Sequence, residues 1–254
     1  ISKMCILDYT PYKLRDWILI DKLDSENLSS NIRAIEILEN NLSSVDWYQL
    51  SSNKNAILLL EQNLDKIYWE SLSQNENALH LLEKYPEKID WDMLSLNPQG
   101  VHLLEKNVNK IYGGWLSSNP GALELLKKYP HLIDWEELSI NPQGISLLEK
   151  NQDKIDWSSL SANPEAMKLI NNNLSKICWD SLSYNENAKV LLEKNLENIN
   201  WSGLSRNKSM ISVLKEYPDL IDWEQLSLNE NAISLLEENQ DKINWFSLSR
   251  NTSI

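Results

Sequence analysis

The sequence is poor in glycine, phenylalanine and cysteine, with 6 Gly, 1 Phe and 2 Cys among 254 residues. No apolar run approaches the roughly 18 residues of a membrane span, and no secretory signal pattern opens the chain. The two cysteines, Cys5 and Cys178, are too few for a disulfide framework, which is typical of a reducing compartment. We therefore expect a soluble, cytoplasmic protein with no membrane partner.

Basic charge is also scarce. The chain has 24 Lys and Arg against 37 Asp and Glu, which gives a formal net charge of −13. A negative surface opposes the sequence-independent attraction to phosphate backbones on which nucleic-acid binding depends. Nucleic acid is therefore excluded as an expected partner, and a basic protein is the partner that charge favours.

Motifs that carry chemistry are absent. There is no phosphate-binding glycine loop, His-Glu-x-x-His, Cys-x-x-Cys or Gly-x-Ser-x-Gly. His80 and His102 are 22 residues apart and, on stacked layers, would lie about 10 Å apart, too far to share one metal ion. Glutamates recur with the same spacing, which indicates a solvated stripe. We expect a protein that is not an enzyme, with no catalytic residue, metal or cofactor.

Tryptophan, by contrast, is abundant, and it marks a repeat. The dipeptide Leu-Ser recurs eleven times with a period of 22 residues, an Asn follows three residues after each Leu, and nine of the 11 Trp precede the Leu by three. The Leu positions are 28, 50, 72, 94, 116, 138, 160, 182, 204, 226 and 248. A fixed period of this kind is the signature of a repeat architecture.

Each repeat predicts two helices. A very short one begins at a capping Asp, as in Asp90, and a longer one begins at Asn97 with Pro98 in its first turn. Neither is long enough to be stable alone, so each must pack on its neighbours. We predict an all-α fold: an α-solenoid of about eleven repeats over 24–254, with 1–23 as an N-terminal capping segment. At about 8–10 Å per layer, it would form a rod or arc of roughly 90–110 Å.

The two ends depart from the pattern. Thr10-Pro11 resembles a helix start, and Leu14, Trp17 and Ile18 could form an amphipathic capping helix. At the other end the last repeat is incomplete, because the chain stops at Ile254 before its longer helix. An uncovered terminal repeat is unfavourable. We expect the intact protein to continue, a partner to cover this repeat through end-to-end contact, or the end to fray.

Two ladders of identical residues have alternative explanations. The Asn ladder is explained by one N-cap per helix, while a hydrogen-bonding spine or a comb for ligands is the alternative. The Trp of each repeat lies on the same helix face as the Leu of the Leu-Ser pair, which favours a core position for the Trp ladder. The alternative is an exposed row of aromatic rings that stacks ligands.

Departures from the repeat are the candidate contact residues. Gly113 replaces the expected Trp, and Trp115 stands two residues later, about 200° around a helix. Either the Gly-Gly pair unwinds the turn so that Trp115 refills the space, or Trp115 is exposed for a partner. Nearby residues also depart from the pattern or face outward. The candidate partner-binding set is Tyr68, His80, His102, Tyr112 and Trp115. Neutral drift in a tolerant array is the alternative.

The repeat unit, D-W-x-x-L-S-x-N-P-x-A-I-x-L-L-E-K-N-x-D-K-I, resembles tandem repeats in proteins of giant DNA viruses of the mimivirus type over about residues 24–251. By period alone it is similar to leucine-rich-variant and other short two-helix solenoids. Neither resemblance implies a catalytic residue. The resulting hypothesis is a non-enzymatic scaffold for protein–protein interaction, in the host cytoplasm if viral. The alternative is a structural component of a virion or other large assembly.

Overall fold

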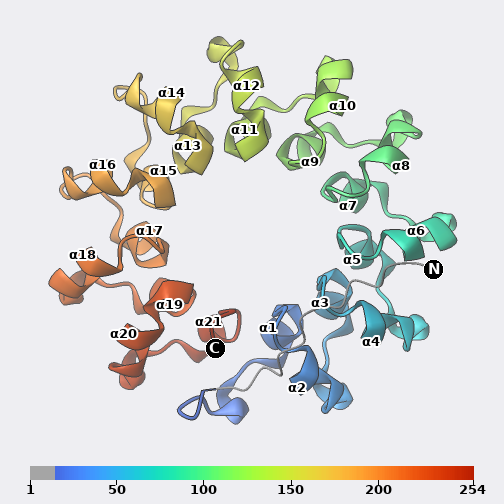
Figure 1. Ribbon diagram of the computed structural model, residues 1–254, viewed down its shortest axis with the longest axis horizontal. Helices are drawn as coiled ribbons and strands as arrows, with labels where there is room; N and C mark the ends of the chain where they lie inside the picture. The colour runs from blue at the N-terminus through green and yellow to red at the C-terminus, as the bar shows by residue number, and fades with distance from the viewer. Residues whose placement is uncertain (1–14) are drawn as a thin grey trace, which may run out of the picture.

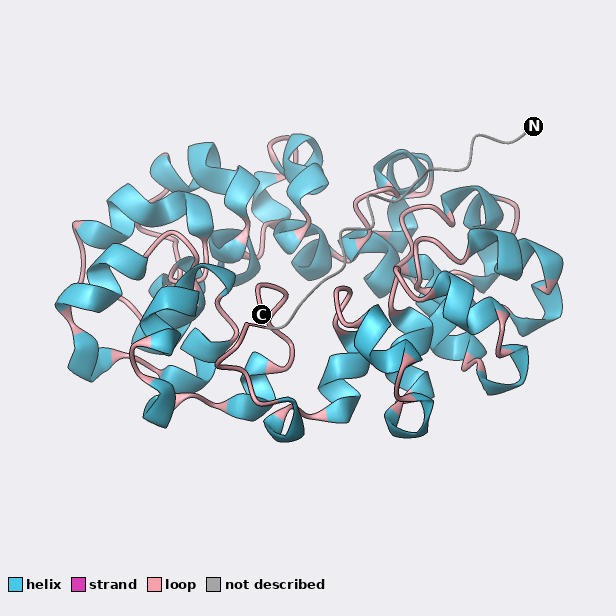
Figure 2. Ribbon diagram, turned by 60° about the horizontal axis from the view of Figure 1, so that its bottom comes forward, coloured by secondary structure: helices cyan, strands magenta, loops and turns pink. Residues whose placement is uncertain are grey.

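The computed structural model describes residues 15–254, in which all regular secondary structure is helical, without a strand. Its helices form two concentric rows that curve into a ring (Figure 1). The ring is tilted in Figure 2, where only helices and loops are seen. The predicted all-α array of short helices repeating every 22 residues is confirmed.

The inner row consists of eleven helices within residues 15–254, and Figure 1 shows most of them end-on, so their axes run along the axis of the ring. Their bounds are α1 (Ser25–Ser30), α3 (Trp47–Ser52), α5 (Trp69–Ser73), α7 (Trp91–Ser95), α9 (Gly113–Ser118), α11 (Trp135–Ile140), α13 (Trp157–Ala162), α15 (Trp179–Leu182), α17 (Trp201–Arg206), α19 (Trp223–Ser227) and α21 (Trp245–Leu248). The predicted cap is confirmed, since the Asp90 carboxylate accepts a hydrogen bond from the Met93 N–H at 2.9 Å.

The outer row has ten α-helices in the described chain. Their bounds are α2 (Ile35–Glu39), α4 (Ile57–Glu61), α6 (Leu79–Lys84), α8 (Val101–Glu105), α10 (Leu123–Lys128), α12 (Ile145–Leu148), α14 (Met167–Asn171), α16 (Lys189–Glu193), α18 (Ile211–Glu216) and α20 (Ile233–Glu237). They are hardly longer than the inner helices. The predicted longer helix is interrupted, because the residues after the capping Asn form a separate turn. Before α12, for example, this turn is the 3-10 helix Pro142–Gly144, which follows Asn141.

Nine further 3-10 helices lead into inner helices: eight follow an outer helix and one precedes α1, whereas α14 and α16 are followed by turns without a 3-10 helix. The nine are Ile20–Lys22, Leu42–Ser44, Leu64–Lys66, Pro86–Lys88, Val108–Lys110, Pro130–Leu132, Gln152–Lys154, Pro218–Leu220 and Gln240–Lys242. Three others, Pro164–Ala166, Glu186–Ala188 and Glu230–Ala232, precede α14, α16 and α20. The first of the linking turns, Ile20–Lys22, already stands 22 residues before its counterpart Leu42–Ser44.

The Asn ladder joins neighbouring layers. The Asn141 side chain donates through Nδ2 to the carbonyls of Ser117 at 2.9 Å and Asn119 at 3.1 Å, both in the preceding repeat. Its Oδ1 accepts from the N–H of Gln143 at 3.0 Å. Each buried Asn therefore caps the following turn and also forms the hydrogen-bonding spine that the sequence offered only as an alternative. The same donations to the preceding layer come from Asn53, Asn75, Asn97, Asn119, Asn163, Asn185, Asn207, Asn229 and Asn251.

The first and last repeats are joined by the same bonds. Asn31 Nδ2 donates to the carbonyls of Ser249 at 3.3 Å and Asn251 at 3.2 Å. The N–H of Asp24 donates to Ser249 Oγ at 2.8 Å, as the N–H of Asp46 donates to Ser29 Oγ at 3.0 Å inside the array. Because these three bonds of an internal joint recur here, the eleven layers close into a ring (Figure 1).

Closure corrects the rod or arc that the sequence predicts. The last repeat is covered by the first repeat of the same chain, and Ile254 is buried at 2 % exposure. The uncovered surface on which predicted end-to-end contact depended is therefore occupied. Of the predicted capping segment 1–23, residues 1–14, with Cys5, Thr10-Pro11 and Leu14, lie outside the described residues. Ile18 is buried in the core and Trp17 packs against it, without a helix at 15–19.

The core lies between the two rows. The Leu of every Leu-Ser pair is buried, as is one Leu or its equivalent from each outer helix. The ladder tryptophans are half-buried and pack against this core. The Lys near the end of the same repeat unit covers the ring of several of them. Lys66 Nζ lies 4.7 Å from the Trp47 ring centroid, and Lys110 Nζ lies 4.3 Å from that of Trp91. Lys22 covers Trp245 in the same way across the closure, at 4.9 Å.

Candidate functional site

The interior of the ring is the surface that packing leaves free to vary. On an inner helix, the residue after the Trp position and the residue after Leu-Ser both lie about 160° around the helix from the buried Leu, at 100° per residue. The Leu faces the outer row, so these two positions face the centre of the ring. The first stands at the N-terminal end of each inner helix and the second at its C-terminal end, so they lie toward opposite faces of the ring.

The first of these positions is acidic. It carries six exposed carboxylates and no Lys or Arg among its eleven copies, and we call these six residues the acidic rim. They are Glu26, Glu70, Asp92, Glu136, Asp180 and Glu224. Negative charge at the N-termini of these helices is favoured by the unpaired N–H groups there. The rim therefore places six exposed carboxylates, and no basic side chain, toward one face of the ring.

Exposed aromatic side chains interrupt the acidic rim. Phe246 and Tyr48 take the same repeat position on either side of Glu26 and are 57 % and 42 % exposed. The Tyr48 ring meets that of Tyr68 edge to face, with centroids 5.7 Å apart. Carboxylates mixed with aromatic faces suit cationic side chains, which pair with the former and stack on the latter. This stretch is complementary to a Lys- or Arg-bearing segment.

The second interior position is basic in one sector. Arg206 and Arg250 stand there with Leu228 between them and Tyr184 beside them, on four successive inner layers. These four residues line a cavity of about 440 Å³, which we call the basic pocket, and its wall is completed by Glu186, Lys208 and Glu230. The other copies of this position are uncharged: Ser30, Ser52, Gln74, Leu96, Ser118, Ile140 and Ala162.

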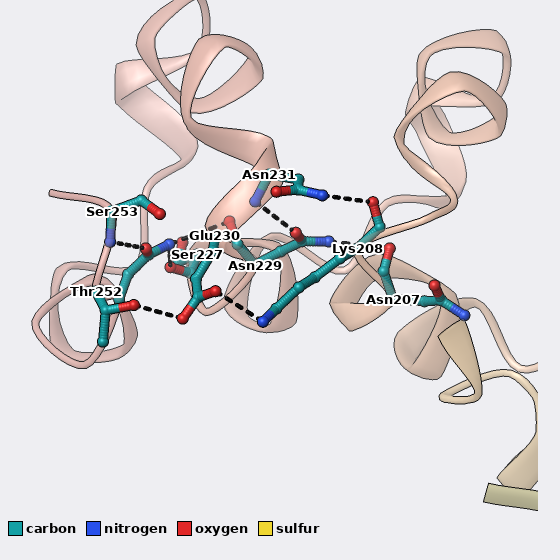
Figure 3. A network of polar contacts seen from close by, with 9 residues as sticks. Asn207, Lys208, Ser227, Asn229, Glu230, Asn231, Thr252 and Ser253 are labelled. Carbon is teal, nitrogen blue, oxygen red and sulfur yellow. Dashed lines mark hydrogen bonds and ion pairs between the residues drawn. The ribbon is translucent and has the colours of Figure 1, made fainter. Parts of the chain in front are cut away.

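Within the pocket, Lys208 is neutralised by Glu230. Their Nζ and Oε2 atoms lie 2.7 Å apart, and Thr252 also hydrogen-bonds to the same carboxylate (Figure 3). The hydrogen bond from Lys208, then that from Thr252, lowers the pKa of Glu230, and the charge of Arg33 adds to the effect. Glu230 therefore stays ionised, and the guanidinium groups of Arg206 and Arg250 supply the positive charge that remains.

The sequence-predicted contact residues divide between two places. Tyr68 and Tyr112 stand at the N-caps of α5 and α9 and are 53 % and 57 % exposed. His80 and His102 lie on the outer helices α6 and α8, where each bonds a glutamate one layer back: Glu61 at 2.8 Å and Glu83 at 3.1 Å. Among the described residues, no hydrogen bond or ring contact joins these histidines to these tyrosines. No group of three metal-ligating side chains is found within residues 15–254.

Trp115 follows neither of the two predicted alternatives. The turn is not unwound, since α9 runs from Gly113 to Ser118, and Trp115 is half-buried with its ring edge to face with Tyr112 at 5.7 Å. Where the Trp is missing, the backbone of the 3-10 turn Pro130–Leu132, in the same repeat unit, approaches Gly113 closely. A Cβ on Gly113 would lie 2.5 Å from the Leu132 carbonyl oxygen, so only glycine permits this approach.

Sequence reasoning missed the basic pocket. Arg206 and Arg250 are 44 residues apart and look like isolated surface residues. The available signal is that both directly follow a Leu-Ser pair and that the chain has only four arginines, the others being Arg15 and Arg33.

Comparison of the chain with protein-family models, with curated proteins and with solved structures gives no match. Residues 15–254 contain no helix with the length and apolar character of a membrane span.

Proposed function

We propose that this protein is a non-enzymatic scaffold that holds a partner protein against the interior of its ring. The observation that carries the proposal is closure: the same interlayer bonds recur between the first and last repeats, so the interior positions form a fixed circular array. The buried Leu, Ser and Asn of each layer are constant, whereas the two interior positions vary. A rigid array with varied exposed residues binds without paying a large ordering cost.

The partner surface that fits the acidic rim is basic. The rim carboxylates are exposed and, across the closure, mixed with the exposed rings of Tyr48 and Phe246. A Lys- or Arg-rich segment would gain charge complementarity, which raises the association rate and selects the partner. The sequence of the repeat unit resembles that of repeats in giant DNA virus proteins. On this resemblance, the proposal includes a viral scaffold that acts in the host cytoplasm.

The alternative from sequence is a structural component of a virion or other large assembly. No observation in the described chain favours it, because the last repeat already contacts the first.

The test is affinity capture followed by mass spectrometry with two matched variants. The rim variant carries Glu70→Gln, Asp92→Asn, Glu136→Gln and Glu224→Gln, while the control carries Glu→Gln at four exposed positions off the interior: 39, 87, 237 and 238. Both remove four charges. We expect the rim variant to lose basic partners that the control retains. Equal retention by the two variants, with the fold intact by circular dichroism, would refute the proposal. A third variant, with Tyr68, Tyr112 and Trp115 replaced by Ala, tests the surface predicted from sequence.

A further inference from the structure

The basic pocket is opposite in charge to the rest of the interior and stands at the other ends of the inner helices. Its two arginines are the only charged residues among the eleven copies of the position after Leu-Ser. Packing does not require them, since Ser, Ala, Gln and Ile occupy the same position elsewhere. Two guanidinium groups in one cavity of a protein with net charge −13 therefore need a separate explanation.

The two arginines are held differently, and both keep donors available. Arg250 Nε bonds to Asn27 Oδ1 across the closure, and its guanidinium lies 5.8 Å from the Phe246 ring centroid. These contacts fix the side chain and leave its terminal NH₂ groups without a hydrogen-bond partner within residues 15–254. Arg206 forms no hydrogen bond or ion pair within residues 15–254 and is exposed. Glu186 is the one unpaired carboxylate in the pocket wall, so the arginines outnumber it.

We propose that the basic pocket binds an extended acidic segment of a partner protein, in which carboxylates flank an apolar side chain. Guanidinium groups bind carboxylates through paired N–H donors. Arg206 and Arg250 are two layers apart, roughly 16–20 Å between backbones at 8–10 Å per layer, so one small anion does not bridge them as well as two carboxylates on one segment. Leu228 lies between the two arginines and, with Tyr184, supplies the apolar contact.

A cavity of about 440 Å³ is of the size that takes a few side chains of a ligand. The paired Lys208 and Glu230 then serve as a wall, because each already neutralises the other. This site is independent of the proposed function, since it lies at the opposite ends of the inner helices and selects the opposite charge.

The experiment measures fluorescence anisotropy of a labelled peptide, Gly-Glu-Glu-Leu-Glu-Glu-Gly, with the full chain. We expect saturable binding that the double variant Arg206→Glu/Arg250→Glu weakens at least tenfold. The control is Lys54→Glu/Lys150→Glu, which changes the net charge equally at exposed lysines outside the pocket, and it should change the affinity less than twofold. Circular dichroism melting checks that both variants fold.

Three results would overturn the proposal. The first is absence of peptide binding to the wild-type chain, and the second is equal weakening of binding by the two double variants. The third is that a peptide with all four Glu replaced by Gln binds as tightly as the original peptide. Competition by free glutamate at the concentration of the peptide would show a site for a single small anion and would also overturn it. Replacing the central Leu of the peptide by Ser should weaken binding severalfold if Leu228 and Tyr184 make the apolar contact.

Discussion

Asn31 donates its side-chain amide to the backbone carbonyl of Ser249, 218 residues later in the chain, at 3.3 Å. Within the array the same bond joins residues only 24 apart, as from Asn53 to Ser29 at 3.0 Å. The two bonds differ in sequence separation but not in chemistry. Within residues 15–254, the first and last layers therefore stabilise each other as two internal neighbours do.

Replacing this residue tests closure in solution. Asn31→Ala removes the two donations to the last repeat and the Oδ1 bond to the N–H of Arg33. We expect a loss of about 2–4 kcal/mol in the free energy of unfolding, because buried carbonyls lose their partners. Asn141→Ala, which breaks the same bonds inside the array, is the matched control. Urea denaturation should give similar losses for both.

A ring that is open in solution would give another result. Asn31→Ala would then cost only the local bond to Arg33, well below the cost of Asn141→Ala. Small-angle scattering provides an independent measurement, since the wild-type chain should show the radius of gyration of a closed ring.

The sequence predicts the layer well but not the ring. The Asp90 cap and the burial of Leu94 depend on neighbours within one repeat, so local pattern is sufficient. Closure depends on the rotation between layers, roughly 33° for eleven layers, and a few degrees of error per layer would give an open spiral. The donations from Asn141 Nδ2 were also hidden, because their acceptors belong to the adjacent layer.

The candidate site shows the same division. Tyr112 and Trp115 were found as departures from the repeat, and their contact with each other was within reach of a local argument. Arg206 and Arg250 become neighbours only when successive layers curve the same position toward one cavity. The spacing of residues along the chain does not show how the layers curve, so it could not predict this cavity.

Replacing Gly113 or Gly114 by Ala, which adds one methyl group, should change the stability of the fold in opposite directions. In Gly113→Ala the new Cβ would meet the Leu132 carbonyl oxygen at 2.5 Å, and backbone must shift. We expect destabilisation by about 1–2 kcal/mol, more than the helix preference of Ala returns. In Gly114→Ala the nearest atom is Tyr112 Cε1 at 3.1 Å, in an exposed ring that can move. That variant should be neutral or more stable by up to about 1 kcal/mol in thermal unfolding. Equal effects would contradict the close approach.

The Lys–Trp contacts should contribute measurably to stability, because they hold the segment after an outer helix on the inner helix of the same repeat unit. Lys110→Met keeps the length of the side chain but removes the charge over the Trp91 ring, 4.3 Å from its centroid. We expect a loss of about 0.5–1 kcal/mol by urea denaturation. Lys150→Met, at an exposed Lys that covers no aromatic ring in the described part of the chain, serves as the control and should change stability by less. Identical losses would mean that general charge, and not the ring, is responsible.

The stability difference between the wild type and Glu230→Gln should depend on pH. Its pKa is lowered in the folded chain, chiefly by the hydrogen bond from Lys208, so the native state favours the ionised form. The associated stability is present above the unfolded pKa, about 4.3, and is lost as pH falls through the lower folded pKa. Glu230→Gln should therefore be less stable than wild type at pH 7 by up to about 1 kcal/mol, as for a surface pair, and the two should converge near pH 3. Glu186→Gln, which removes an unpaired carboxylate of the same pocket, should show a smaller difference at pH 7. A Glu230→Gln difference that persisted unchanged at pH 3 would show that the contact with Lys208 does not stabilise the ring through charge.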